Sequence, residues 1–228
     1  MINKSIFINK LNKRIELKDV YNKSDIFRIE KAINLSKFLF NEIYPKRTIN
    51  SIYLDNHLFN SLTDSFDGNC SRKKTRIRWY GNSMKPTPST LEIKKKQGFI
   101  SWKETSKNSH IVDPSAINWS NFITKKNKHE FFNYESENLL PKSIVSYNRR
   151  YFASFDRKIR ITIDNELKFF EQVSTCKPNL KYANYRSQIM VTEIKVDLSN
   201  HHVLNDLLTD LPFTSRRFSK YSESVSLY

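Results

Sequence analysis

Hydrophobic and polar residues alternate along several stretches of this chain, and a period of two is typical of a β-strand with one buried face. The stretches are residues 25–33, 50–55, 74–80, 90–96, 99–103, 144–152, 158–170 and 188–196. Gly81-Asn82 and Gln97-Gly98 mark turns between strands. Eight strands in antiparallel succession can close into a barrel, so we expect a mainly β (α+β) fold: an eight-stranded antiparallel β-barrel.

The rest of the pattern predicts flanking helices and a single domain. A helix is expected around residues 35–43, with a stop at Pro45. Residues 107–140 are irregular and partly helical in pattern, the tail from Val203 is helical, and residues 219–224 predict a final short helix. Residues 1–24 are polar and weakly patterned, which predicts a basic N-terminal arm. No change of composition divides residues 25–228, so they are expected to form one domain.

Composition and charge narrow the function classes. The 228 residues are 38% hydrophobic and include three glycines, which indicates a folded chain rather than a low-complexity one. Lys and Arg number 39 against 23 Asp and Glu, a net charge of +16. Such an excess attracts polyanions: nucleic acid, an anionic membrane, nucleotides or polyphosphate. Because Lys and Asn are abundant throughout, the positions of the charges are more informative than their total.

Cysteine usage and hydropathy indicate a cytoplasmic protein. Cys70 and Cys176 lie far apart, and the five histidines form no metal-ligand spacing with them. Residues 1–13 contain no apolar stretch of signal-peptide length, and no run approaches the roughly 20 apolar residues that span a bilayer.

Charged residues recur two positions apart on the predicted strands, so they share a face. Arg76 and Arg78 lie opposite Ile77 and Trp79. The same arrangement recurs at Arg28-x-Glu30, Glu92-x-Lys94-x-Lys96, Arg160-x-Thr162-x-Asp164 and Glu193-x-Lys195. A solvated sheet face also alternates in this way. However, opposed like charges destabilise a sheet by up to about 1 kcal/mol per pair, so a face this basic favours binding of a polyanion.

Four acidic residues lie on the same predicted faces as these cations: Glu30, Glu92, Asp164 and Glu193. Carboxylates among many cations suit a divalent metal ion that bridges phosphate oxygens. Salt bridges to the neighbouring arginines are an equally good explanation for each acid taken separately.

Several segments in order resemble the VTC domain, the polyphosphate-polymerase branch of the triphosphate tunnel metalloenzymes. They are Ser51-Ile-Tyr-Leu-Asp55, Arg76-Ile-Arg-Trp-Tyr-Gly81, Leu91-Glu-Ile-Lys94, Lys103, Tyr147-Asn-Arg149 with Phe152, Ile159-Arg-Ile-Thr-Ile-Asp164, Glu193-Ile-Lys195 and Arg217-Phe-Ser-Lys220-Tyr221. The resemblance covers about residues 25–225. It implies an eight-stranded tunnel closed by a C-terminal helix, in which ATP donates its γ-phosphoryl group to a growing polyphosphate chain with Mn²⁺ or Mg²⁺.

The resemblance also implies roles for individual residues. The expected catalytic group is Arg76, Arg78, Lys94, Lys103, Arg149, Arg160 and Lys220. Substrate binding is expected from Arg28, Lys195 and Arg217. Glu193 matches the metal-holding acid of the family, and Glu92 and Glu30 are further candidate metal ligands. These roles agree with the chemistry, because phosphoryl transfer needs positioning and charge neutralisation, and arginine binds phosphate oxygens in a bidentate way.

One segment departs from the family pattern. Bacterial members tend to show Arg-x-Glu-x-Lys on the first strand, but the segment 27–33 has Ala32 where the second basic residue is expected. Lys31 does not replace it, because an offset of one residue points to the other face of a strand. The loss of a basic residue at this position is expected to affect turnover more than substrate binding.

Three other functions compete with the polymerase. A tunnel-fold triphosphatase typically uses Glu-x-Glu pairs, whereas this chain has Glu92-x-Lys94 and Glu193-x-Lys195. A non-catalytic polyphosphate or nucleotide sensor would fit the Ala32 departure. Aromatic residues could stack on bases, but most lie on apolar strand faces, so no nucleic-acid partner is expected. The expected partners are ATP or another nucleoside triphosphate and polyphosphate, and a separate membrane partner stays open.

Overall fold

The computed structural model describes residues 7–8, 13–81, 87–106, 110–113, 118–119, 139–183 and 185–226. The strands are β1 (Phe7–Ile8), β2 (Arg14–Asn22), β3 (Asn41–Asp55), β4 (Ser71–Tyr80), β5 (Thr87–Gln97), β6 (Ile100–Ser106), β7 (His110–Val112), β8 (Leu140–Ala153), β9 (Ile159–Glu171), β10 (Tyr185–Arg186) and β11 (Ile189–Asp197). The helices are α1 (Ile26–Leu35), α2 (Asn60–Phe66), α4 (Leu204–Asp210) and α5 (Lys220–Val225), with 3₁₀ turns η1 (Lys23–Asp25) and η2 (Leu198–Val203).

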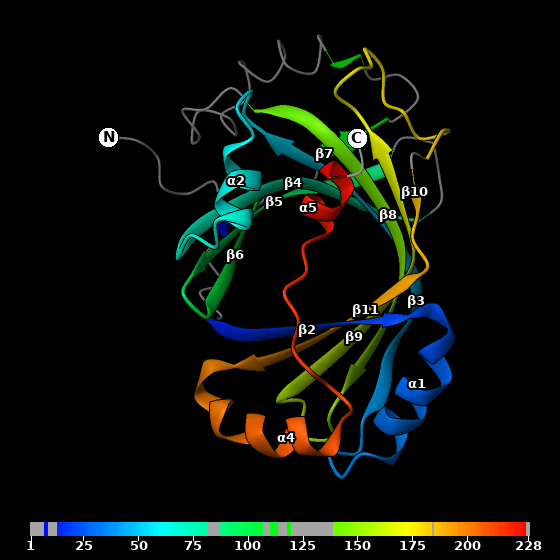
Figure 1. Ribbon diagram of the computed structural model, residues 1–228, viewed down its shortest axis with the longest axis vertical. Coiled ribbons are helices and arrows are strands. Elements are labelled where there is room, and N and C mark those ends of the chain that lie inside the picture. Colours follow the sequence, from blue (N-terminus) through cyan, green and yellow to red (C-terminus); the bar gives the residue numbers. More distant parts are fainter. Residues whose placement is uncertain are drawn as a thin grey trace.

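Eight of these strands form a closed antiparallel barrel, as the alternating pattern predicts (Figure 1). The order around the barrel is β2-β11-β9-β8-β3-β4-β5-β6, and β6 returns to β2. The joint between β6 and β2 is short, because only Arg14↔Ser101 and Ile15↔Ile100 pair across it. By contrast β2 pairs with β11 along its whole length, from Arg14 to Asn22. The strand β2 therefore has a free edge beyond Ile15 on its β6 side.

The predicted strand at residues 25–33 is wrong, because this segment forms the helix α1. Its apolar residues Ile26, Ile29 and Ile33 recur three and four positions apart, which is the period of a helix. Ile29 and Ile33 are buried against the outer face of the barrel. Tertiary packing of this apolar face decides between two periods that the short segment fits about equally well.

The predicted helix at residues 35–43 and the stop at Pro45 are also wrong. The helix α1 ends at Leu35, and β3 begins at Asn41 and runs through Pro45. Proline has no N–H to donate, and it is tolerated in a strand at a bulge because the ladder hydrogen bonds are interrupted there. The register of β3 against β8 shifts between Tyr44 and Arg47, on either side of Pro45.

The N-terminal arm is the third correction. Residues 14–22 of the expected arm form β2, a full member of the barrel, and the expected domain boundary at residue 25 does not exist. Most of residues 1–12 lie outside the described part of the chain, as does most of the segment 107–140 that was expected to be irregular. The helices predicted from Val203 and at residues 219–224 are confirmed as α4 and α5.

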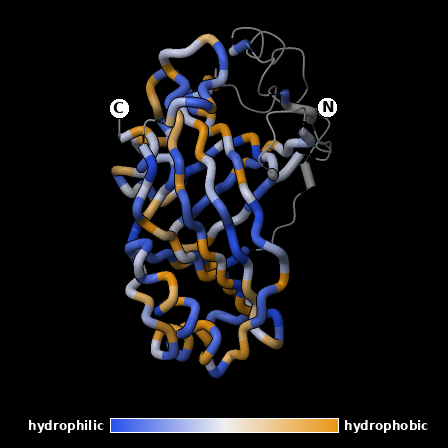
Figure 2. Tube along the Cα trace, turned by 90° about the vertical axis from the view of Figure 1, so that its right-hand side faces the viewer, coloured by the Kyte–Doolittle hydropathy of each residue, from blue (hydrophilic) through white to orange (hydrophobic). Residues whose placement is uncertain are grey.

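Hydrophobic and hydrophilic positions alternate along much of the strands (Figure 2), and where apolar residues follow one another, as Ile52 and Tyr53 do, they pack on both sides of the barrel wall. Outside, Ile161, Ile194 and their neighbours pack beneath α1 and α4. A second outer cluster around Ile77 and Trp79 covers β3, β4, β5 and β8. Inside, Tyr221 of α5 packs against Tyr53, Tyr147 and other apolar residues, so α5 fills one part of the barrel interior.

Residues 211–219, here called the crossing segment, connect α4 outside the barrel to α5 inside it (Figure 1). The segment follows the free edge of β2: the Arg216 amide donates to the Lys18 carbonyl at 2.6 Å, and the Thr214 amide donates to Asp19 Oδ2 at 2.7 Å. The first of these bonds satisfies a backbone carbonyl of β2 that β6 does not reach, and the second binds the Asp19 side chain. In the described part of the chain, no helix is long and apolar enough to cross a membrane.

Candidate functional site

The inward face of the barrel is lined with charged side chains, because the apolar residues that alternate with them face the outer cores. These lumen residues come from seven strands of the barrel and from α5. They are Arg14, Glu16 and Lys18 of β2, Lys74, Arg76 and Arg78 of β4, Glu92, Lys94 and Lys96 of β5, Lys103 of β6, Arg149 of β8, Asp164 of β9, Glu193 and Lys195 of β11, and Lys220 of α5. Cations clearly outnumber carboxylates in this set.

One cluster in the lumen centres on Glu92. Arg76 Nε donates to Glu92 Oε2 at 2.8 Å, Lys103 Nζ donates to Glu92 Oε1 at 2.8 Å, and Arg78 NH1 lies 3.5 Å from Glu92 Oε2. Burial alone would raise the pKa of Glu92, but the three cations hold it well below its usual value. Arg78 also donates to the Tyr147 hydroxyl at 3.3 Å. The sequence-predicted residues Arg76, Arg78, Lys103 and Glu92 therefore lie together.

A second cluster joins the barrel wall to α5 through Asp164. Arg149 NH2 donates to Asp164 Oδ2 at 2.7 Å, and Lys220 Nζ lies 2.6 Å from the same oxygen. Asp164 is fully buried, and its two cations lower its pKa to about 2 although burial opposes this. Lys220 lies over the Tyr147 ring, with Nζ 4.7 Å from the ring centre. Arg149 and Lys220, both predicted from the sequence, therefore lie together in the lumen.

A third cluster contains Glu16, Glu193, Lys94 and Lys195. Lys94 Nζ contacts Glu16 and lies 3.9 Å from Glu193, and Lys195 Nζ lies 3.2 Å from Glu193. Burial would raise the pKa of Glu193, but the surrounding cations, Lys195 and Lys18 first, hold it well below its usual value. Burial lowers the pKa of Lys195 to about 8 despite this partner. Lys94, Lys195 and Glu193 were predicted from the sequence, whereas Glu16 was missed.

The missed residues lie on β2, in the segment Arg14-Ile-Glu16-Leu-Lys18. This segment has the spacing Arg-x-Glu-x-Lys that bacterial members of the resembled family show on the first strand. The spacing that residues 27–33 lack is therefore present in the sequence at residues 14–18. The departure at Ala32 disappears, because Ala32 lies on α1 and packs against the outer core.

The lysines of the lumen carry an excess of positive charge that the protein itself does not neutralise. Burial, with Lys94 and Lys220 nearby, lowers the pKa of Lys18 to about 7 although Glu193 opposes this. Burial and the neighbouring Lys18 and Lys94 hold the pKa of Lys74 well below its usual value. Such shifts report that the charged form lacks a matching anion. An anion with several oxygens is the ligand that this electrostatic environment favours.

Four predicted residues lie at the edge of the lumen or outside it. Arg160 follows the lumen face of β9, but its side chain is 43% exposed and lies 3.8 Å from Asp197. Arg217 is exposed on the crossing segment. Arg28 and Glu30 are on α1, outside the barrel wall, and Glu30 pairs with Arg150 rather than with the lumen cations. The structure does not bring these two residues together with the other predicted groups.

A divalent metal ion would find few ligands supplied by this protein alone. In the described ranges, no group of three or more His, Cys, Asp or Glu side chains could hold an ion. The carboxylates of Glu16 and Glu193 lie around the same amine, because both contact Lys94 Nζ. Mg²⁺ typically takes one or two carboxylates and completes its shell with water and substrate phosphates. Glu16 and Glu193 fit an ion that arrives with a phosphorylated substrate.

Comparison with known proteins agrees with this fold and with the motifs. The model of the VTC domain family matches residues 9–228. A solved structure from Vibrio parahaemolyticus, described as a "putative adenylate cyclase", covers 93% of this chain and 98% of its own, with a TM-score of 0.50 and 9% identity. At this identity the likeness supports the fold alone. The match to the Schizosaccharomyces pombe Mediator head module covers 87% of this chain and 89% of that chain, with a TM-score of 0.43 and 7% identity. No curated protein matches the chain.

Proposed function

Because the chain belongs to the VTC domain family, whose model covers residues 9–228, we propose that it is a polyphosphate polymerase. In this proposal a nucleoside triphosphate, normally ATP, binds in the lumen beside the end of a polyphosphate chain. A terminal oxygen of the chain attacks the γ-phosphorus, the bond from this phosphorus to the β,γ-bridging oxygen breaks, and the nucleoside diphosphate leaves. The chain becomes one phosphate longer, and no oxidant or reductant is needed.

The observation that carries the proposal is the excess of buried cations in the lumen. Lys18 and Lys195 have pKa values of about 7 and about 8, because they are buried and only partly matched by Glu193. A phosphate chain supplies the missing negative charge along the whole tunnel, and so restores the charged form of these lysines. A single carboxylate-bound metal ion would not do this.

The arginines are suited to hold the transferring group. Arg76 and Arg78 lie two residues apart on β4, and both contact Glu92. Arg149 lies over the ring of Tyr147, whose hydroxyl accepts a hydrogen bond from Arg78. Guanidinium groups that are already oriented by Glu92 and Asp164 can bind equatorial phosphate oxygens without reorganising. In the proposal, Arg76, Arg78 and Arg149 bind the reacting phosphates, and Lys103 and Lys220 neutralise charge nearby.

Glu193, with Glu16, would hold a Mn²⁺ or Mg²⁺ ion. When bound, the ion would neutralise charge on the phosphates. Both glutamates already lie in the lumen, on neighbouring strands β11 and β2. Their cations Lys94 and Lys195 keep them ionised and so ready to bind a metal.

A tunnel-fold triphosphatase is the main alternative, and the arrangement of acids favours the polymerase. Three strands that line the lumen carry Glu-x-Lys: β2 with Glu16-x-Lys18, β5 with Glu92-x-Lys94 and β11 with Glu193-x-Lys195. One acid and one base at this spacing on each strand line a path for a long anion. Pairs of acids, as in Glu-x-Glu, would instead concentrate metal ligands at one point.

The deciding experiment incubates the purified protein with ATP and Mn²⁺, or with ATP and Mg²⁺, and separates the products on a gel stained for polyphosphate. Chains of increasing length support the polymerase. Orthophosphate without chains contradicts it and supports a triphosphatase, and binding of ATP without any product supports a sensor. An Arg78→Ala protein in the same assay controls for a contaminating kinase, because its chain synthesis should fall with the loss of a lumen arginine.

A further inference from the structure

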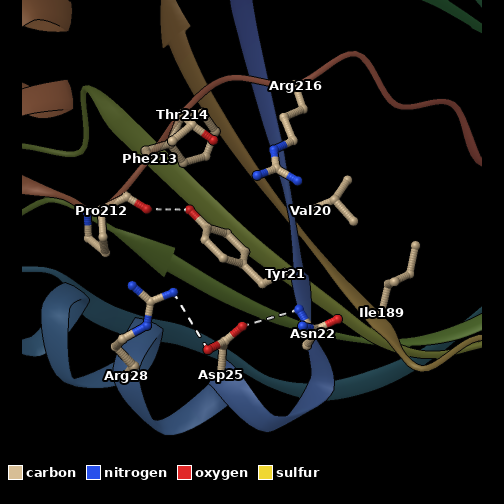
Figure 3. Close-up of a pocket in the computed structure, with 10 residues that line it drawn as sticks. All are labelled: Val20, Tyr21, Asn22, Asp25, Arg28, Ile189, Pro212, Phe213, Thr214 and Arg216. Carbon is tan, nitrogen blue, oxygen red and sulfur yellow. Dashed lines mark hydrogen bonds and ion pairs between the residues drawn. The ribbon is translucent and has the colours of Figure 1, made fainter.

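A pocket of about 480 Å³ lies at the free edge of β2, outside the set of lumen cations (Figure 3). It is enclosed by the end of β2, the start of α1, Ile189 of β11 and the crossing segment. In the close-up, Tyr21 occupies the middle of the view, with Arg28 on one side and Arg216 on the other. A volume of this size is in the range of small-molecule sites.

The pocket adjoins the lumen along β2. Val20, which lines the pocket, follows Lys18 on the same face of the strand, and two strand residues span roughly 7 Å. The crossing segment also connects the two places, since Arg216 lines the pocket and its amide donates to the Lys18 carbonyl at 2.6 Å. The separation between Val20 and the phosphate-binding Lys18 is therefore shorter than an extended nucleoside triphosphate.

Five of the ten residues that line the pocket are apolar or aromatic. Tyr21, Phe213 and Pro212 form one side, and Val20 and Ile189 form the other. The Tyr21 hydroxyl donates to the Pro212 carbonyl at 2.5 Å, which fixes the ring. A polyphosphate chain has no apolar surface to bury against these side chains, whereas a planar heterocycle has.

The charged groups at the rim point to the same ligand class. Arg28 lies 6.0 Å from the centre of the Tyr21 ring, and its NH2 is 3.6 Å from Asp25 Oδ1. Arg216 Nε is 3.5 Å from Asp19 Oδ1. Both arginine side chains are more than half exposed, at 58% and 65%. A guanidinium can stack on a base, while the Asp25 carboxylate accepts from an amino or hydroxyl group and repels phosphate.

We propose that this pocket binds the nucleoside part of the nucleoside triphosphate and so makes ATP a better substrate than inorganic triphosphate. The base lies against Tyr21 and Phe213 with Arg28 over it, and the triphosphate extends past Val20 to Lys18 and the lumen. This inference rests on the proposed function, because it assumes that the lumen holds the phosphates of the same molecule.

The test measures binding of ATP and of inorganic triphosphate by calorimetry, both in metal-free buffer so that neither compound is turned over. Arg28→Ala is expected to weaken ATP binding about 5- to 10-fold, the size of a lost cation–π contact at a partly exposed site. Inorganic triphosphate affinity should change by less than about twofold, because a charge this distant is screened. Arg216→Ala, also exposed, should give the same selective loss.

Two control variants separate stacking from charge. Lys31→Ala removes one exposed positive charge from the same helix without touching the pocket, and should leave both affinities unchanged. Arg28→Lys keeps the charge but not the planar guanidinium, and should resemble Arg28→Ala for ATP. Retained ATP affinity in Arg28→Lys would contradict a stacked base and overturn the assignment.

The other outcomes are also decisive. Equal losses of ATP and inorganic triphosphate in Arg28→Ala would put Arg28 on the phosphate path and overturn the nucleoside assignment. Unchanged ATP affinity in both arginine variants would overturn it as well, and in either case the wild-type protein still binds inorganic triphosphate. A wild-type protein that binds no inorganic triphosphate would instead overturn the proposed function, and the pocket assignment with it.

Discussion

Lys18 Nζ donates a hydrogen bond to the main-chain carbonyl of Phe218 at 3.1 Å. This bond joins a lumen side chain of β2 to the crossing segment, immediately before α5. The bond partner is neutral, and Glu193 is shared with Lys195 and Lys94. Lys18 is therefore a buried amine whose positive charge the protein only partly balances, which explains why its pKa is about 7.

Binding of triphosphate should be accompanied by proton uptake at Lys18. In the free protein its pKa is about 7, and a bound anion raises this value. At pH 8 the amine is mostly neutral before binding and charged afterwards, so roughly one proton is taken up and affinity falls as pH rises above 7. Calorimetry at pH 8 in two buffers of different ionisation enthalpy measures this uptake. Lys18→Met should lower the uptake by roughly one proton and leave the contribution of Lys195, whose pKa is about 8. An unchanged uptake would contradict the assignment.

Loss of Arg78 should weaken triphosphate binding by about 10- to 100-fold, the value of a charge-assisted hydrogen bond in a buried site. Its side chain is only 9% exposed and points at Glu92 and Tyr147. Arg150→Ala is the matched control, because Arg150 is on the same barrel but pairs with Glu30 and Glu42 on the outside. Filter binding or calorimetry of Arg78→Ala and Arg150→Ala makes the comparison. Similar affinities in the two variants would refute the inward assignment of Arg78.

Glu193→Gln should reduce metal-dependent turnover at least about 10-fold, because it removes a charged metal ligand. Binding of triphosphate in metal-free buffer should stay the same or become tighter, since one lumen carboxylate that repels phosphate is gone. Glu30→Gln is the control: its carboxylate pairs with Arg150 outside the lumen, so turnover should not change. Activity assays with Mn²⁺ and Mg²⁺ test both variants. Full activity of Glu193→Gln would exclude its metal role.

Asp164→Asn should destabilise the free protein by about 3–5 kcal/mol, because it leaves Arg149 and Lys220 buried without their shared anion. Urea unfolding measures this loss, and added inorganic triphosphate should recover part of it by supplying negative charge. Asp206→Asn breaks an exposed pair with Lys37 and should cost less than about 1 kcal/mol. Equal costs for the two substitutions would show that Asp164 is not needed to balance the lumen.

Much of the barrel and of the lumen could be predicted from the sequence, because one physical rule produces both. Residues such as Arg76 and Ile77 alternate strictly, so the strand and the direction of each side chain follow together. The clusters around Glu92 and Asp164 needed only this rule and the resemblance. Which cation pairs with which acid depends on the order of strands around the barrel, and alternation carries no information about that order.

The strand β2 was missed because its alternation is interrupted. Asp19 faces outward, where an apolar residue is expected, yet it is only 1% exposed. Its carboxylate accepts hydrogen bonds from Thr214, almost 200 residues away in the sequence. A buried acid of this kind is stable only through such a distant partner. The segment containing α1 was misassigned for the opposite reason, since Ile29 and Ile33 fit a helix face and a strand face until their packing partners are known.

Because β2 pairs with β6 at only two positions, its stable place in the barrel depends on partners that are synthesised late. The strand β2, near the start of the chain, has its full-length partner in β11 at residues 189–197 and its other edge covered by the crossing segment at residues 211–219. The ribosome must therefore release the chain as far as about residue 219 before the barrel closes. Until then the lysines and arginines of the lumen remain hydrated, and the nascent chain carries its positive charge exposed to the polyanions of the cell.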